Sequence, residues 1–316
     1  MPISRSRDEI FGARVEAFTR ALGEVEQGEA RAIHRTRVAS RRLREMVPVL
    51  QLDRDDCRRL MRILREVTRA LGVLREADVL LALVEDLRHE RRKSGRALDV
   101  VHERLRAERL ARLADARRAH IGRRLQRAGQ RLEKTARRLE AETPRGARRR
   151  WLWAVDARIA RRAAAVAHAV DAAGSLYLPE RLHEVRKAVK KLRYAAELHV
   201  EAVPSDRRVT VSSLRRWQDL LGTLHDRQVL MERIRRLQAD GSATADRTIR
   251  QQFDVILARL EDECRLLHGR YLKGRRGLLA QCERLATRHA DRPARAVVTR
   301  SLRTDRAERA ARASRS

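Results

Sequence analysis

The sequence contains few residues of the kinds that cross-link a chain or span a membrane. Its 316 residues include three cysteines, Cys57, Cys264 and Cys282, and none of them has CxxC spacing. This odd number argues against a disulfide framework and against a cysteine-built zinc site, and it is typical of the reducing cytoplasm. No stretch free of formal charge exceeds eight residues, so we expect no membrane span. The charged N-terminal residues also lack the apolar region of a secretory signal.

Aromatic residues make up only 3% of the chain, and there are six prolines. Ala, Leu, Arg and Glu dominate, and apolar residues recur at spacings of three and four without sustained alternation. These features predict an all-α protein with long antiparallel helices. We expect helices to break at Gly72 and Gly222, among other glycine- and proline-containing segments, and a kink or an early end at Pro48.

Acidic residues are few relative to basic ones. Lys and Arg total 74 against 43 Asp and Glu, which gives a formal net charge of +31. A GC-rich genome can explain why so many of the basic residues are Arg, but it cannot explain their excess over acids. Residues 289–316 form an Arg-rich segment that we expect to be a disordered tail. The excess of basic over acidic residues is not confined to this segment, so the folded part of the chain is also cationic.

One pattern occurs twice, and it reads apolar-His-x-x-Arg-x-x-x-basic-basic-Leu-Arg. The first copy spans Ile33–Arg44 and the second spans Leu182–Arg193. A Leu-Gly-x-Leu segment begins 37 residues after the first His, at Leu71, and 38 residues after the second, at Leu221. Two ordered motifs at nearly matched separation predict an internal duplication of one helical unit, with halves at 1–145 and 146–288.

On a helix, with about 100° per residue, each motif places its cations along one face and its apolar residues along the opposite face. The two rows are His34, Arg37, Arg41 and Arg44, and His183, Arg186, Lys190 and Arg193. Like charges spaced in this way repel one another and weaken an isolated helix. Such rows are either solvated surface or the lining of an anion site, and the matched duplication favours the anion site.

The residue types suit phosphate, because Arg offers bidentate donors to phosphate oxygens and Lys offers a point charge. Single-stranded nucleic acid usually needs aromatic stacking platforms, and only Tyr194 adjoins a motif. Duplex DNA bound through its backbone stays open, although no helix-turn-helix or zinc-finger pattern is present. A polymer with phosphates and no bases fits the rows best, which predicts inorganic polyphosphate as the ligand.

The paired motifs, the second continuing into Tyr194, resemble the CHAD domain, the conserved histidine α-helical domain. The resemblance covers about residues 8–288. It implies two four-helix bundles related by a pseudo-two-fold axis, with a basic central groove or pore that binds inorganic polyphosphate.

The resemblance also implies a set of ligand residues at the positions of the two motifs. They are His34, Arg37, Arg41, Arg42, Arg44, His183, Arg186, Lys187, Lys190, Lys191 and Arg193. Four residues of the downstream segments are expected to support them, with the two acids orienting basic side chains: Arg75, Glu76, His225 and Asp226. Glu76 departs from the family pattern, which favours Asp after Arg.

Signatures of enzymes are scarce. The segment Gly269–Gly274 has Walker-like spacing, but Arg275 and Arg276 replace the required Lys and Ser or Thr. No histidine pair has zinc-ligand spacing, and there is neither a paired carboxylate constellation nor the ExExK motif of CYTH-type triphosphatases. We therefore expect a non-catalytic protein without cofactor or metal, which binds polyphosphate in the cytoplasm, on polyphosphate granules. The alternative is a nucleic-acid-associated basic protein that contacts DNA or RNA backbones.

Overall fold

The computed structural model describes residues 5–90, 95–141, 147–203, 208–240 and 246–313, with side chains described as far as Ala290 except at residues 147 and 208–210. Helices make up nearly all of these residues, and no strand occurs among them. The prediction of an all-α protein is therefore confirmed.

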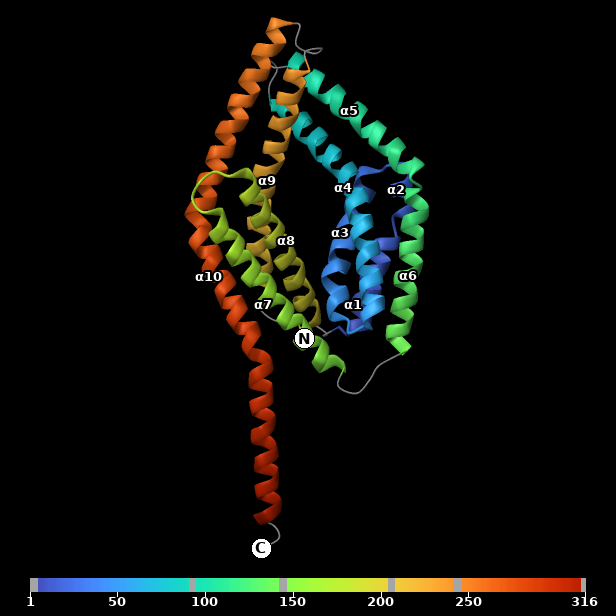
Figure 1. Cartoon of the computed structure of the whole chain (residues 1–316), viewed down its shortest axis with the longest axis vertical. Coiled ribbons are helices and arrows are strands. Elements are labelled where there is room, and N and C mark those ends of the chain that lie inside the picture. The colour runs from blue at the N-terminus through green and yellow to red at the C-terminus, as the bar shows by residue number, and fades with distance from the viewer. Residues whose placement is uncertain (1–4, 91–94, 142–146, 204–207, 241–245, 314–316) are drawn as a thin grey trace.

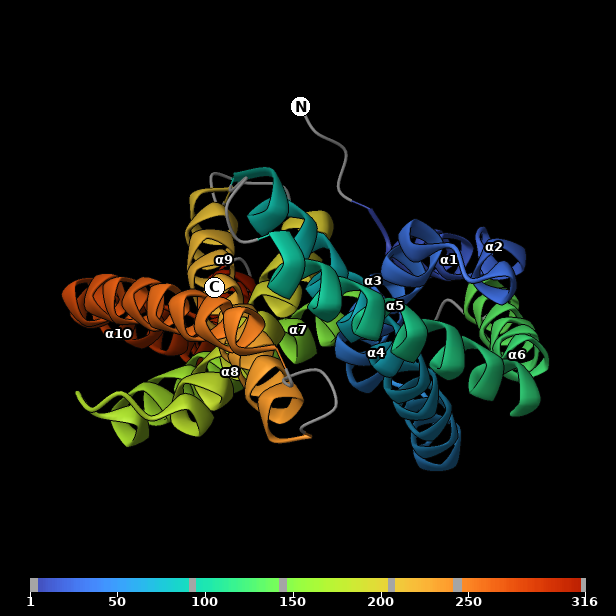
Figure 2. The ribbon, with the colours of Figure 1, turned by 90° about the horizontal axis from the view of Figure 1, so that it is seen from above.

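The helices pack in two sets that lie side by side (Figures 1 and 2). The first set comprises α1 (Arg7–Thr19), α2 (Leu22–Gln27), α3 (Ala30–Met46), the 3-10 helix η1 (Val47–Val49), α4 (Arg54–Glu90), α5 (Gly95–Arg118) and α6 (Ile121–Ala141). The second set comprises α7 (Ala147–Ala173), α8 (Pro179–Ala202), α9 (Arg208–Ala239) and α10 (Arg247–Ala313). Contacts between α3 and α8, between α4 and α9 and between α5 and α10 join the two sets.

Local chemistry explains where several helices begin and end. Ser6 and Glu9 form a capping box at the start of α1, since each side chain accepts a hydrogen bond from the other residue's backbone N–H. Gly28 ends α2 with a φ of 92°, a left-handed conformation that favours glycine. The 3-10 helix η1 contains Pro48, so the expected early end of the α-helix at this proline is confirmed.

The expected breaks at Gly72 and Gly222 are wrong. Both glycines lie inside long helices, because α4 runs for 37 residues and α9 for 32. A glycine in a helix interior costs about 1 kcal/mol relative to alanine, and the packing of such long helices readily outweighs that cost.

Two buried apolar clusters hold the molecule together. The larger one contains Phe11 and Leu43 from the first set of helices and Trp151 and Tyr271 from the second. The smaller one combines residues around Leu80 on α4 and Leu98 on α5 with others around Leu230 on α9 and Phe253 on α10. Since each cluster draws on both sets, the two sets meet in two separate apolar interfaces.

The expected disordered tail is residues 289–316, and α10 extends over this segment as far as Ala313, the last residue described (Figure 1). His289 lies one residue beyond the expected boundary at residue 288. His289 is 2% exposed, and its Nδ1 lies 2.7 Å from Oδ1 of Asp156 on α7. This buried contact makes His289 part of the folded body. Over the residues described, no helix is long and apolar enough to cross a membrane.

Candidate functional site

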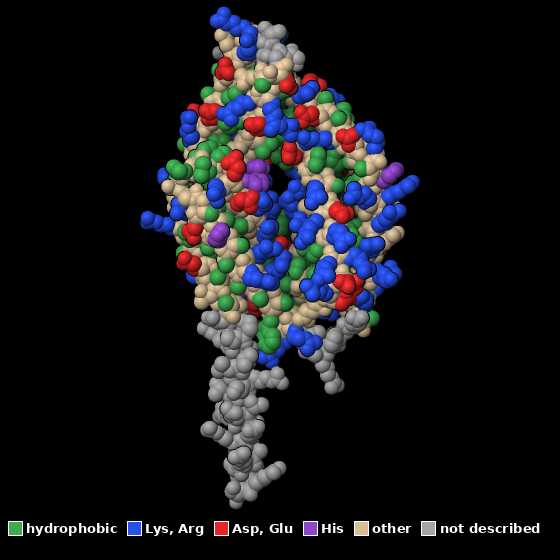
Figure 3. Space-filling model, in the orientation of Figure 1, with side chains coloured by type: hydrophobic (Ala, Val, Ile, Leu, Met, Phe, Trp, Pro, Cys, Tyr) green, Lys and Arg blue, Asp and Glu red, His purple; other side chains and the backbone are tan. Residues whose placement is uncertain are grey.

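A cavity of about 490 Å³ lies between the two sets of helices. Its walls come from α3 and α4 on one side and from α8 and α9 on the other. These four helices carry the two basic motifs and the two Leu-Gly-x-Leu segments. Figure 3 shows a hollow in the middle of the molecule with Lys and Arg side chains along its sides and His at its edge.

Most of the side chains predicted from the sequence line this cavity. They are His34, Arg37, Arg41, Arg75, Glu76, Arg186, Lys190, Arg193, His225 and Asp226. The fold thus brings together residues that are about 150 positions apart in the sequence. Tyr194, Gln218 and Asp219 also line the cavity, and the motif residues alone did not predict the last two.

The glycines of the two Leu-Gly-x-Leu segments make room for motif arginines. A Cβ atom on Gly72 would lie 3.3 Å from an Nη atom of Arg37, and one on Gly222 would lie 3.9 Å from Nε of Arg186. Each arginine thus passes close to the facing helix where that helix has no side chain. A glycine inside a strongly periodic helical pattern is the signal for such a close approach.

Two of these arginines have nitrogen atoms that are buried without a hydrogen-bond partner. They are Nη1 of Arg37 and Nε of Arg186, which lie in corresponding positions of the two motifs. Burial, together with neighbouring cations, lowers the pKa of Arg37 to about 10 and also lowers that of Arg186. An anion that accepts hydrogen bonds from these donors would offset the cost of burying them.

Lys190 is the most strongly perturbed cation of the cavity. Burial and the nearby Arg41, Arg186 and Arg37 lower its pKa to about 6, while Asp226 acts in the opposite direction. Burial also lowers the pKa of Arg41, which Tyr194 partly counteracts through a hydrogen bond. The free cavity therefore holds its positive charge at a cost in free energy.

The histidines of the site are held in their neutral form. Burial and nearby cations lower the pKa of His34 and His183, and they lower that of His225 to about 3. His183 Nδ1 and His225 Nδ1 lie 3.3 Å apart. Neutral imidazoles offer one donor and one acceptor each, so they supply hydrogen bonds here rather than charge.

The two acids behave differently. Asp226 lies 3.7 Å from Arg186, in keeping with the expected orienting role, and burial raises its pKa despite this arginine. Glu76 accepts a hydrogen bond from Arg233 on α9 at 3.1 Å and lies 3.9 Å from Arg112 on α5. Its ion pairs are thus with arginines outside the basic motifs.

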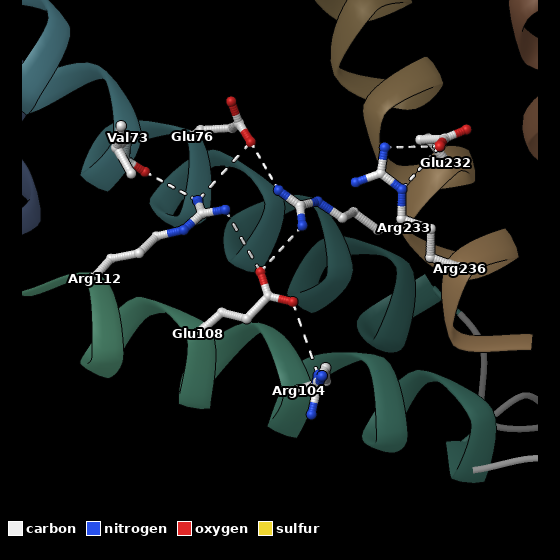
Figure 4. A network of polar contacts seen from close by, with 8 residues as sticks. All are labelled: Val73, Glu76, Arg104, Glu108, Arg112, Glu232, Arg233 and Arg236. Carbon is white, nitrogen blue, oxygen red and sulfur yellow. Dashed lines mark hydrogen bonds and ion pairs between the residues drawn. The ribbon is translucent and has the colours of Figure 1, made fainter. Parts of the chain in front are cut away.

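Figure 4 shows the network around Glu76. Arg233 also donates to Glu108 on α5 at 3.3 Å, and Arg112 donates to the carbonyl oxygen of Val73 at 3.1 Å. This network ties α9 to α4 and α5 beside the smaller apolar cluster. Glu76 therefore helps to hold the two sets of helices together at one end of the cavity.

At another part of the wall, Arg193 is fixed by its neighbours. It forms an ion pair with Glu197, its Nε donates to Gln218 at 2.8 Å, and its guanidinium lies 4.4 Å from the centre of the Tyr194 ring. Glu197 also accepts a hydrogen bond from Arg42 at 3.1 Å. Arg193 is thus oriented toward the cavity by contacts on three sides.

Five predicted ligand residues do not line this cavity. Arg42 pairs with Glu197, Lys187 pairs with Glu184 at 2.7 Å, and Lys191 is exposed. Arg44 is half-buried beside Glu45. The fifth residue, His183, lines a neighbouring cavity of about 970 Å³, which shares Glu76, His225 and Val229 with the first. The helical face predicted from the sequence includes Arg44 because periodicity describes one helix alone and not how far the cavity extends along it.

The fold and this site define an all-helical protein with a cation-lined cavity between two sets of helices. The sequence profile of the CHAD domain matches residues 9–235, and the chain belongs to the CHAD domain family.

Two solved structures are similar to this one. One is the crystal structure of the CHAD domain from the plant Ricinus communis, with a TM-score of 0.55 and 21% identity, covering 85% of this chain and 93% of that one. The other is PptA from Streptomyces chartreusis, with a TM-score of 0.56 and 20% identity, covering 88% of this chain and 98% of that one. At such identities the likeness shows the shared fold. No curated protein sequence matches the chain.

The position of Lys190 predicts how the stability of the free protein depends on pH. Its pKa is about 6 in the folded protein and close to the ordinary 10.5 when unfolded, so between these values the unfolded chain binds more protons. Stability from this residue therefore rises with pH across that window. We expect Lys190→Met to raise the melting temperature at pH 7 and to flatten its rise between pH 7 and 9. An unchanged profile in thermal denaturation would contradict the lowered pKa of Lys190 in the folded protein.

Proposed function

We propose that this protein binds linear inorganic polyphosphate in the cavity between its two sets of helices. The observation that supports the proposal most strongly is the pairing of buried cations across the cavity, where Arg37 and Arg41 face Arg186 and Lys190. Such an arrangement costs stability in the free protein, and a polyanion would neutralise it. Charge-assisted hydrogen bonds from guanidinium groups to phosphate oxygens would supply the affinity.

We further infer that the two motif-bearing halves arose by duplication and that the cavity is the centre of a basic groove. The parallel placement of Arg37 over Gly72 and of Arg186 near Gly222 supports this inference. The histidines of the motifs, His34 and His183, both lie beside these arginines. A ligand with a repeating unit suits a site built from two similar halves.

The lining also supports a phosphate polymer over nucleic acid. Tyr194 is the single aromatic side chain apart from histidine among the residues described along the cavity, and it is 3% exposed. Its ring already contacts the guanidinium of Arg193. Among the residues described along these walls, a nucleobase would therefore find no free Phe, Tyr or Trp ring to stack on, whereas phosphate oxygens would find donors on both sides.

We propose that binding proceeds without cleavage and that the protein associates with polyphosphate granules or brings partners to them. The described carboxylates along the cavity are Glu76, Asp219 and Asp226. Glu76 is paired with Arg233 and Asp226 lies near Arg186, which suits a positioning role for both. Incubation of the protein with polyphosphate and Mg²⁺ or Mn²⁺ should release no phosphate above the blank.

A titration of the full chain with long-chain polyphosphate and with duplex DNA of equal charge tests the proposal. At about 50 and 200 mM salt, counterion release should weaken non-specific binding to either polymer steeply. We expect polyphosphate binding to persist at the higher salt and DNA binding to collapse. Equal weakening of both would favour the nucleic-acid-associated protein instead.

Reversing two charges in the cavity should remove most of the affinity. We expect Arg41→Glu combined with Lys190→Glu to weaken polyphosphate binding at least tenfold, or about 1.4 kcal/mol. The matched control is Arg31→Glu with Arg181→Glu, which also replaces two basic residues by glutamate, at exposed positions of the same two helices. If calorimetry shows the same loss of polyphosphate affinity for the two double variants, the positive charge of the whole surface, and not the cavity, is responsible for binding.

The two glycines provide a second matched pair of variants. Alanine at position 72 would press on Arg37, whereas alanine at position 222 would meet Arg186 at an ordinary contact distance. We expect Gly72→Ala to weaken polyphosphate binding several-fold and Gly222→Ala to change it little. Both should keep or raise the melting temperature, since alanine favours a helix interior. Equal affinities for the two variants would show that the path of Arg37 past α4 is unimportant.

A further inference from the structure

A cluster of ionisable side chains lies deep in the second set of helices, away from the cavity. It consists of Asp156 on α7, His199 on α8 and His289 on α10, which are 2%, 1% and 2% exposed. Oδ1 of Asp156 lies 2.7 Å from Nδ1 of His289 and 3.1 Å from Nδ1 of His199. The two imidazole rings meet edge to face with their centroids 5.0 Å apart.

The three residues present a set of metal-ligating atoms at short range. One ligand atom from each residue lies within 4.8 Å of the other two. Ligands of a tetrahedral Zn²⁺ site lie about 2.0–2.2 Å from the ion, which places them roughly 3.3 Å from one another. To admit an ion, the carboxylate oxygen would therefore need to separate by about 0.6 Å from His289 Nδ1 and by about 0.2 Å from His199 Nδ1.

We propose that Asp156, His199 and His289 form a binding site for a transition-metal ion, with Zn²⁺ as the best match. Two imidazole nitrogens and one carboxylate oxygen suit Zn²⁺ and its neighbours among the divalent transition metals, whereas Ca²⁺ and Mg²⁺ prefer oxygen ligands throughout. The three residues supply three of the four ligands of a tetrahedral ion, and a water molecule would supply the fourth. Because the side chains are almost fully buried, the ion would not meet a substrate.

The location gives the ion a clear effect on the fold. His289 belongs to the last stretch of α10 whose side chains are described, whereas Asp156 comes from α7, against which α10 packs, and His199 comes from α8. An ion bound by all three would fix α10 to the body of the protein at this point. The spacing of histidines along the chain offered no sign of the site, because the ligands come from three separate helices.

Cobalt binding tests the proposal directly, with Co²⁺ as a coloured substitute for Zn²⁺. The full chain, without an affinity tag and without polyphosphate, is treated with EDTA, dialysed and titrated with Co²⁺. We expect one equivalent to bind with the intense visible absorption of a tetrahedral site and to be displaced by Zn²⁺. Zn²⁺ should also raise the melting temperature by about 5 °C. Less than one equivalent in the wild-type protein would overturn the proposal without reliance on any variant.

Variants locate the ion. His289→Ala and Asp156→Asn should lose the tetrahedral absorption, and the second keeps the size of the side chain and one hydrogen-bond acceptor. The control is His168→Ala, which removes an exposed histidine from the same helix as Asp156 and should bind as the wild type does. Retention of the band by His289→Ala would place the ion elsewhere and contradict the proposal.

The outcome is independent of polyphosphate binding. None of the three residues lines the cavity, so the EDTA-treated protein should keep its polyphosphate affinity whether or not it binds Co²⁺. The two measurements therefore distinguish failure of the metal-site proposal from failure of the polyphosphate-binding proposal.

Discussion

Repulsion between cations that face one another across a narrow cavity is the constraint on which this structure depends. Arg37, Arg41 and Arg186 would lie farther apart in any arrangement chosen for electrostatic stability alone. Burial and the charges of these three arginines lower the pKa of Lys190 to about 6. The fold keeps them together because the helices that carry them are long and anchored elsewhere. Burial in the two apolar clusters supplies the free energy that offsets the repulsion.

Hydrogen-bonded acids limit the repulsion without neutralising it. Asp226 lies beside Arg186, Glu197 holds Arg193 and Arg42, and Glu45 accepts hydrogen bonds from Arg158 and Arg162 behind α3. These carboxylates are placed around the edge of the cationic group or behind it. The centre of the cavity therefore keeps donors that have no acceptor in the protein, as at Nη1 of Arg37.

The helical fold could be predicted from the sequence, and ten of the fifteen residues proposed for the site line the cavity, because helical periodicity and a repeated motif are local signals. The places of Arg37 and Lys190 on the basic faces of their helices follow from about 100° per residue, and the structure brings both to the cavity. What periodicity could not show was the neighbouring helix. Periodicity places Arg44 in line with Arg41, although Arg44 does not line the cavity, and Gly72 predicts a break, although α4 continues through it. Periodicity also could not predict that Asp156, His199 and His289 lie together, because they come from three separate helices.

The two apolar clusters have a consequence for how the molecule comes apart. Helices α4 and α9 each contribute to both clusters. Leu64 and Leu221 belong to the larger one, and Val84 and Ile234 belong to the smaller one. Either half of the chain expressed alone would expose its side of both interfaces to water. The repeat in the sequence therefore marks a pattern of residues and not a unit of folding, and the whole body should melt in one cooperative step.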